Sequence, residues 1–287
     1  MPAPLRILVV GAHPDDAEYK CGGSAARWVD AGHVIKFVSV TDGRSGHHLV
    51  PPEELVGIRL AETRAAANTL GIESEVLPFP DGSLEPSLEA RRAIIRLVRE
   101  WHPDLVLTHR PNDYHPDHRY TSQIVQDAAY MVMVPHVCPE FPPLQRNPAI
   151  FYLSDGFTRP YPFTPDAFVV INPTFDRKIK AMACHRSQFF EWLPHVEGQA
   201  EVPSDPAKRE VWLSNRMKAH DGDLGRRHRE RIPARLRKIS TGEPLLLEAF
   251  EACEYGGRLT PGEFRSVFGH DPLETGSPTG IGQAERE

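Results

Sequence analysis

The sequence predicts an α/β fold, with a Rossmann-like, mostly parallel sheet flanked by helices and a C-terminal extension. Short runs rich in Val, Ile and Leu alternate with amphipathic stretches through about the first 130 residues. This alternation of strand and helix signals is typical of a parallel sheet with helices on both faces. A chain of 287 residues is long enough for one large domain with a smaller appendage.

Four apolar runs are predicted as buried strands of this sheet. They are Leu5–Gly11, Val34–Thr41, Glu75–Phe79 and Leu105–Thr108. Branched side chains in such short runs favour strands that are covered on both faces. No GxGxxG motif follows the first run, so the sequence gives no support for a dinucleotide site.

Amphipathic helices are predicted between these strands. The second has apolar residues at helical spacing from Val56 to Leu70, and the third from Ile94 to Trp101. Gly32 follows the first helix and Gly71 follows the second, as expected of helix C-termini, and Pro103 stops the third. The predicted order of elements is therefore a repeated strand–helix unit.

From Ala149 onward the pattern is less regular. "AIFYLS" and "DAFVVI" are predicted as strands, "PTFDRKIKAMACHRSQFFEWL" as a helix and Gly198–Pro206 as a loop. A polar helix, a basic stretch and the compact segment "EPLLLEAFEACEYGG" follow. We expect one domain over residues 1–257, with a core at 5–190 and a substrate-shaping part at 191–257. Residues 258–287 are expected to form a short helix and a flexible tail.

Composition narrows the classes of function. The net charge of −6 does not support nucleic-acid binding, and the basic stretch from Gly225 to Lys238 is interpreted as a solvated helix face or a subunit contact. No run of 18 apolar residues and no signal-peptide pattern is found, so we expect no membrane span and a cytoplasmic protein. Four widely spaced cysteines without a CxxC pair are expected to be free thiols: Cys21, Cys138, Cys184 and Cys253. Cys21 and Cys184 are expected to pack as small residues, with a nucleophilic role as the alternative.

The tripeptide His-Pro-Asp occurs three times, starting at His13, His102 and His115. The first and third copies follow predicted strands and open helices, so both should lie at the carboxyl edge of the sheet, where ligands bind. The copy at His102 precedes a strand and should lie at the opposite edge, where its proline ends a helix and its aspartate begins a strand. Helix capping explains one aspartate per helix but not the adjacent Asp15 and Asp16, nor a second histidine at His118.

These residues are predicted to form a metal site. Two imidazoles and one carboxylate, His13, His118 and Asp16, make the ligand set of a catalytic zinc site, and the same set could hold iron(II) or another divalent metal. Asp15 is then free to act as a general base, which favours hydrolysis over oxygen chemistry. His115 could polarise or protonate a substrate, and Asp117 would hydrogen-bond one of the histidines and fix its tautomer.

The motifs "AHPDDAEYKCGG" and "RPNDYHPDH" resemble the two signature motifs of the LmbE-like, or PIG-L, zinc-dependent N-deacetylases. "SVTDGRSG", "IRLAETRAAANTLG", "LPFPDGSL" and "FDRKIKAMACHRSQ" resemble further segments of that family, with coverage from about residue 5 to 190 and more weakly to Gly257. The resemblance implies hydrolysis of an N-acetyl group from an amino sugar, commonly an N-acetylglucosamine unit, in a homo-oligomer such as a trimer or hexamer.

The resemblance also implies roles for single residues. It implies that His13, Asp16 and His118 bind zinc and that Asp15 is the general base. It also implies that His115 faces the oxyanion and the leaving amine, and that Asp117 adjusts the properties of His115. Substrate contacts are expected at Arg59, Asp81, Arg44 and Asp113. An exposed ion pair with Glu62 is the alternative for Arg59, and a plain turn is the alternative for Asp81.

One departure and two alternatives accompany this hypothesis. Tyr114 directly precedes His115, whereas some family members place a tyrosine further back, so the role of that tyrosine is not transferred. The same centre could instead be an amidase that cleaves a sugar–thiol conjugate. A metal- or sugar-binding module without catalysis is the other alternative, although binding alone needs neither Asp15 nor His115.

Overall fold

The computed structural model describes residues 3–198, 202–239 and 244–273. Within these described residues, seven strands form one sheet in the order β3-β2-β1-β4-β5-β7-β6. Their bounds are Arg6–Gly11 (β1), Val34–Thr41 (β2), Glu73–Phe79 (β3), Leu105–Thr108 (β4), Ala149–Leu153 (β5), Ala167–Val170 (β6) and Leu247–Ala252 (β7). Strands β1 to β5 are parallel, and β7 runs antiparallel between β5 and β6. The α/β, mostly parallel fold predicted from the sequence is confirmed.

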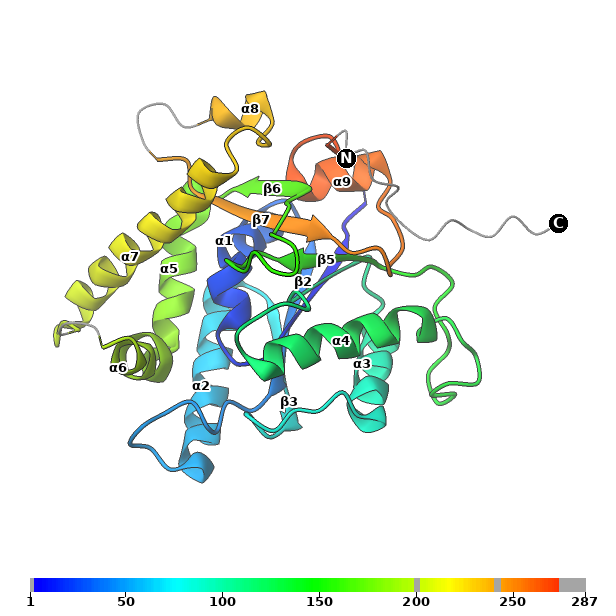
Figure 1. Ribbon diagram of the computed structural model, residues 1–287, viewed down its shortest axis with the longest axis horizontal. Helices are drawn as coiled ribbons and strands as arrows, with labels where there is room; N and C mark the ends of the chain where they lie inside the picture. The colour runs from blue at the N-terminus through cyan, green and yellow to red at the C-terminus, as the bar shows by residue number, and fades with distance from the viewer. Residues whose placement is uncertain (1–2, 199–201, 240–243, 274–287) are drawn as a thin grey trace.

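Helices cover both faces of the sheet (Figure 1). Their bounds are Asp16–Asp30 (α1), Pro52–Leu70 (α2), Leu88–Trp101 (α3), Pro116–Met131 (α4), Phe175–Cys184 (α5), Leu193–Val196 (α6), Pro206–Arg227 (α7), Ala234–Arg237 (α8) and Pro261–Phe268 (α9). Helices α1, α2 and α5 pack on one face, against buried residues such as Val9 and Phe37, whereas α3 and α4 pack on the other, against Val10 and Val38. Because successive side chains of a strand point to opposite faces, each central strand contributes to both cores.

The predicted helix over residues 173–193 is wrong as a single element. A 3-10 turn, η1 (Asn172–Thr174), precedes α5, which ends at Cys184, and a π-helix, η2 (Ser187–Trp192), follows before α6. The break lies at His185, whose ψ of 62° is outside the helical region. Its imidazole is fully buried with Nε2 3.2 Å from Glu18 Oε1 of α1. The end of α5 therefore coincides with a contact between His185 and another helix.

The C-terminal part extends the sheet. The segment predicted as compact contains β7, which joins β5 to β6, and a third core beneath β6 and β7 includes Ile232 and Leu236 of the basic stretch. That stretch forms the end of α7, a turn and α8. The expected tail beyond residue 273 and part of the expected loop, residues 199–201, lie outside the described residues.

Candidate active site

Two loops meet at the carboxyl edge of the sheet. Strands β1 and β4 are parallel neighbours, with Val10 opposite Thr108, so the segments after them start side by side. The first carries His13, Asp15 and Asp16 into α1, and the second carries His115 and His118 into α4. The copy of the tripeptide at His102 instead ends α3 in a left-handed conformation, at the opposite edge.

The backbone at Asp15 is strained. Its φ of 121° is far from the conformations that residues with a Cβ prefer, and Asp15 is neither glycine nor asparagine. Such strain persists only where the surroundings hold it, and it occurs preferentially at functional sites. Here it separates two adjacent carboxylates, so that Asp15 and Asp16 take different partners.

Potential ligand atoms of three residues converge between the loops. His13 Nδ1 lies 3.2 Å from His118 Nε2 and 3.5 Å from Asp16 Oδ2, and His118 Nε2 lies 3.3 Å from Asp16 Oδ1. A tetrahedral ion with ligand bonds of about 2.0–2.1 Å places its ligand atoms about 3.3 Å apart. The spacing of these atoms therefore fits a small divalent metal ion.

The outer nitrogens of both histidines face carboxylates. His118 Nδ1 is hydrogen-bonded to Asp113 Oδ1 at 2.9 Å. His13 Nε2 lies 3.0 Å from Asp81 Oδ1 and 3.4 Å from Asp117 Oδ2. Metal-binding histidines usually donate their second ring N–H to a carboxylate or carbonyl, which fixes the tautomer and orients the ring. This arrangement is a second, independent reason why the residues fit a metal ion.

The carboxylate of Asp16 is held in its charged form. Oδ2 accepts hydrogen bonds from the backbone N–H groups of Ala12, at 3.0 Å, and His13, at 2.7 Å. Burial alone would raise the pKa of Asp16, but the neighbouring His118 and His109 hold it well below its ordinary value. Asp16 is therefore an anionic ligand group at neutral pH.

The environment of Asp15 is different. Its carboxylate is buried, and burial raises the pKa of Asp15 to about 7, against the opposing effect of Arg59. Arg59 Nη1 lies 3.9 Å from Asp15 Oδ2 and donates a hydrogen bond to the Pro14 carbonyl at 3.1 Å. A carboxyl group with a pKa near neutrality is suited to take up and release a proton.

His115 is held in one tautomer by the start of α4. Its Nδ1 accepts a hydrogen bond from the backbone N–H of Asp117 at 3.2 Å. In neutral His115 the proton therefore resides on Nε2, which is available as a donor. Burial, together with His13 and His118, lowers the pKa of His115. The ring centroid lies 4.5 Å from that of His13, so this donor is beside the proposed ligands.

Four residues with expected roles face other groups of the protein in the structure. The carboxylate of Asp117 accepts from the Gly82 N–H and faces His13, and its backbone N–H donates to His115 Nδ1. Asp81 and Asp113, the expected substrate contacts, face His13 and His118, because neighbouring loops bring their carboxylates behind those rings. Arg44 is paired with Asp42 of its own loop, at 2.6 Å.

Arg59 is buried, so the alternative of an exposed ion pair with Glu62 is wrong. Glu62 instead accepts hydrogen bonds from the backbone and hydroxyl of Ser187. Besides Pro14, Arg59 donates to the side-chain oxygen of Gln188, the second residue of the π-helix η2. The guanidinium therefore links the loop that carries Pro14 and Asp15 to η2, which is far away in the sequence.

Two residues of the site were not predicted from the sequence. His109 is fully buried, accepts a hydrogen bond from the Ala12 N–H at 3.0 Å, and stacks on His118 with ring centroids 4.0 Å apart. Burial lowers the pKa of His109 to about 4, so it is neutral at neutral pH. Gln188 is the other. The position of His109 directly after β4 was the available signal, since residues at that edge face the site.

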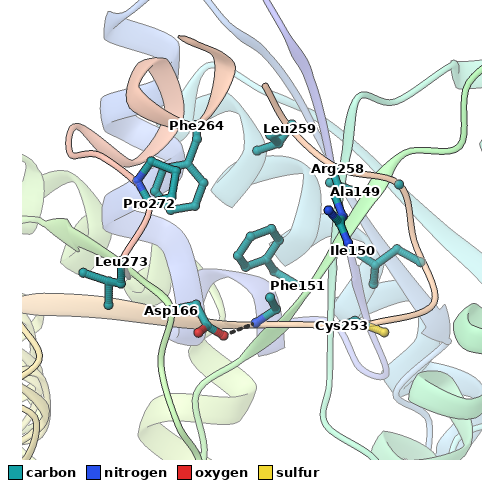
Figure 2. A pocket seen from close by; sticks show the side chains of 12 residues that line it. Ala149, Ile150, Phe151, Asp166, Cys253, Arg258, Leu259, Phe264, Pro272 and Leu273 are labelled. Carbon is teal, nitrogen blue, oxygen red and sulfur yellow. Dashed lines mark hydrogen bonds between the residues drawn. The ribbon is translucent and has the colours of Figure 1, made fainter. Parts of the chain in front are cut away.

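A cavity lies away from the carboxyl edge of the sheet (Figure 2). It has a volume of ≈ 160 Å³ and is lined mainly by apolar side chains of the start of β5, of α9 and of the segment after α9, including Phe151, Phe264 and Leu273. Its one carboxylate, Asp166, accepts a hydrogen bond from the backbone N–H of Ala252 at 2.8 Å. Its lining residues that the structure describes do not include the convergent polar groups expected of a catalytic site.

Comparison with known proteins supports the resemblance. The family model described as GlcNAc-PI de-N-acetylase (PIG-L) matches residues 8–129. The diacetylchitobiose deacetylase of Thermococcus kodakarensis is 29% identical over 208 residues, covering 67% of this chain and 74% of the relative.

Solved structures show the same fold. The N,N'-diacetylchitobiose deacetylase from Pyrococcus horikoshii, solved with an inhibitor, matches with a TM-score of 0.66 and 25% identity over 87% of this chain and 84% of its own. GalB, a 4-carboxy-2-hydroxymuconate hydratase from Pseudomonas putida, matches with a TM-score of 0.67 and 18% identity over 89% of this chain and 98% of its own. At that identity the likeness shows the fold alone. Within the described part of this chain, no helix is long and apolar enough to cross a membrane.

Proposed function

Because residues 8–129 of this chain belong to the PIG-L, or LmbE-like, family, we propose that the protein is a metal-dependent N-deacetylase that releases acetate from an N-acetylated amino sugar. The observation that carries the proposal is the convergence of His13 Nδ1, His118 Nε2 and Asp16 within 3.2–3.5 Å of one another, beside Asp15 and His115. A protein that only binds a metal or a sugar would need the three convergent ligands but neither Asp15 nor His115.

We propose His13, Asp16 and His118 as the ligands and zinc as the metal. When bound, the ion would supply a Lewis acid for the amide carbonyl and would lower the pKa of water beside it. Asp81, Asp117 and Asp113 hold the two imidazoles in place from behind. Because their carboxylates are occupied in this way, they are positioning residues in the proposal and do not contact the sugar.

Asp15 is proposed as the general base. It would accept a proton from the attacking water at its carboxylate, while Arg59, 3.9 Å away, keeps that carboxylate in place. A pKa raised to about 7 by burial also allows Asp15 to give the proton up again, to the departing amine. The C–N bond breaks, and acetate and a free amine are the products.

His115 is proposed to stabilise the developing negative charge on the carbonyl oxygen. Its Nε2–H is the free donor, since Nδ1 is engaged by the Asp117 backbone at 3.2 Å. Preorganised donors of this kind contribute most when charge develops in a site from which water is excluded. His115 is half-buried in the wall of the site.

The experiment that tests the proposal measures acetate release from a panel of N-acetylated amino sugars by the zinc-loaded protein. We expect release from N-acetylglucosamine or from a conjugate of it, with loss of most turnover in Asp15→Asn. Release of a larger acid from a sugar–thiol conjugate, with none from N-acetyl sugars, would favour the amidase. Binding of sugar without release of any acid would favour the non-catalytic module.

A further inference from the structure

A short turn leads from α5 into the π-helix η2. Helix α5 packs against both α1 and α2 (Figure 1). The next four residues, 185–188, are called here the 185–188 turn, and three of their side chains contact those two helices: His185, Ser187 and Gln188. π-Helical turns are rare and occur frequently at functional sites. The proposed roles of the catalytic residues do not account for these three contacts.

The 185–188 turn and α2 are complementary in their polar groups. Glu62 of α2 accepts two hydrogen bonds from Ser187, one from its backbone N–H at 2.8 Å and one from its hydroxyl at 2.7 Å. Arg59 precedes Glu62 by three residues on the same face of α2, and its Nη2 donates to the side-chain oxygen of Gln188. Each segment therefore supplies one donor and one acceptor side chain to the other, which fixes Gln188 relative to Arg59.

Arg59 is held at both ends of its guanidinium. Nη1 donates to the Pro14 carbonyl at 3.1 Å, and Nη2 donates to Gln188. Two glycines of the loop after β2 leave space for this side chain, because a Cβ on Gly43 would lie 3.3 Å from Arg59 Cγ and a Cβ on Gly46 would lie 2.8 Å from Nη2. The buried guanidinium therefore has little freedom to turn, and Gln188 fixes the position of Nη2.

The hydrogen bond from Arg59 to Pro14 acts on the strained backbone of Asp15. The Pro14 carbonyl belongs to the planar peptide group that joins Pro14 to Asp15, and rotation of that group about the N–Cα bond of Asp15 changes the φ angle of Asp15. This angle is 121°, in a region that residues with a Cβ rarely adopt. By holding the peptide group, Arg59 therefore opposes the return of Asp15 to a relaxed φ, which would move its carboxylate.

His185 supports Asp15 from the side of α1. Its Nε2 lies 3.2 Å from Glu18 Oε1 on the first turn of α1, and both side chains are buried. In the same helical turn, the backbone N–H of Tyr19 donates to the Asp15 carbonyl at 2.9 Å. The 185–188 turn is therefore connected to the peptide group before Asp15 through Arg59, and to the helical turn after Asp15 through Glu18.

We propose that Gln188 and His185 are positioning residues for the general base. Through Arg59 and Glu18, they hold Asp15 in the strained conformation that gives its carboxylate different partners from that of Asp16. The inference rests on the proposed function, because that function makes Asp15 the base. Neither positioning residue touches the sugar or the metal in this proposal, so the loss of either side chain should lower turnover without weakening the binding of substrate or metal.

The first test measures kcat and KM for acetate release by zinc-loaded variants. Gln188→Met keeps the length of the side chain but removes the acceptor oxygen, and it should lower kcat about 10–100-fold while KM changes less than about 3-fold. Gln188→Glu keeps an oxygen for Arg59 Nη2 and should recover most of the turnover. The matched control is Gln126→Met, since Gln126 is a half-buried glutamine whose amide donates to Ser122 on its own helix at 2.9 Å. Equal kcat in Gln188→Met and Gln126→Met, or a loss that appears in KM alone, would overturn the proposal.

The second test asks whether the two residues act through their partners. Arg59→Lys keeps the charge but replaces the two-ended guanidinium with a single nitrogen. In that background Gln188→Met should lower kcat by less than about a further 2-fold, because the link is already broken. His185→Leu should lower kcat as Gln188→Met does, whereas His185→Gln, whose amide can still donate to Glu18, should recover part of it. Losses for Arg59 and Gln188 that simply multiply would contradict an action of Gln188 through Arg59.

Crystal structures of the wild type, Gln188→Met and Gln126→Met separate this inference from the proposed function. In Gln188→Met the φ of Asp15 should leave the positive region, or its carboxylate should move by about 1 Å or more, while Gln126→Met changes neither. If the wild type releases acetate and Asp15 is unmoved in Gln188→Met, the positioning role is wrong and the deacetylase stands. If Asp15 moves in Gln188→Met but the wild type releases no acetate from the panel of sugars, the turn holds Asp15 and the proposed reaction is wrong.

Discussion

The substitution Asp113→Asn tests whether the carboxylate of Asp113 orients His118, one of the proposed metal ligands. The side chain of Asp113 is 5% exposed, and its hydrogen bond with His118 at 2.9 Å outweighs the effect of burial and lowers the pKa of Asp113. It is therefore charged at neutral pH and orients His118. The amide of asparagine fills the same space and can still accept from the His115 N–H, which Asp113 now accepts at 3.0 Å.

Because the same Oδ1 atom faces both the His115 N–H and His118 Nδ1, asparagine can keep the contact with His118, and the expected loss is the charge that strengthens that hydrogen bond. Such a bond contributes about 1.5–3 kcal/mol, and removing a carboxylate behind a metal-binding histidine lowers metal affinity about 10–100-fold. We expect a loss in that range in a competition titration against a chelator. At saturating metal, KM for the sugar should stay within about 2-fold, because Asp113 does not face substrate in this account.

Asp127→Asn is the matched control, since Asp127 is on α4, the helix that carries His118, and lies 3.6 Å from Arg91 at the surface. Its metal affinity should equal that of the wild type. An unchanged metal affinity in Asp113→Asn together with a KM raised 10-fold or more would refute the reasoning. It would restore Asp113 to the substrate contacts that the family resemblance first indicated.

Three further predictions concern the base and the fold. Asp15→Asn should keep one metal ion per chain by elemental analysis while its turnover falls about 10²–10⁴-fold; unaltered turnover would exclude Asp15 as the base. Burial lowers the pKa of His33, whose Nδ1 accepts a hydrogen bond from the Leu5 N–H at 3.0 Å. The unfolded chain therefore binds a proton at His33 more readily than the folded protein does. As a result, the free energy of unfolding should decrease as pH falls below 6.5, the ordinary pKa of histidine. Urea titrations at pH 7.5 and 5.5 should show a smaller decrease in His33→Gln; an equal decrease would assign the effect elsewhere. A Cβ on Gly23 would lie 2.7 Å from Ile171 Cβ, so Gly23→Ala should destabilise by about 1–3 kcal/mol, whereas Gly57→Ala, on open helix surface, should stabilise slightly; equal unfolding midpoints would contradict this packing.

The placement of His13, Asp16, Asp15, His115 and His118 could be predicted from the sequence because it depends on one topological rule. Parallel strands present their carboxyl ends at one edge, so two motifs that each follow a strand meet there once the strands are neighbours. The observed pairing of β1 with β4 meets that condition. The same rule separates the copy at His102 from the other two.

The carboxylates that face the site histidines could not be predicted from the sequence. Each of these contacts joins two different loops, and no local sequence pattern shows which loops lie close together. Asp81 follows β3 and reaches behind His13, and the side chain of Asp117 faces His13 although its backbone contacts His115. The end of α5 at His185 likewise coincides with a contact to another element, since Glu18 on α1 lies against that imidazole. Apolar periodicity continues across the break and so does not reveal it.

The most direct test of the central claim is acetate release from N-acetylated amino sugars by the protein stripped of metal and then titrated with zinc. The account predicts no release by the stripped protein, recovery that saturates at one ion per chain, and no recovery in His118→Ala, which lacks one of the three convergent ligands. Full activity of the stripped wild type, or recovery of His118→Ala at the same zinc concentration, would contradict it.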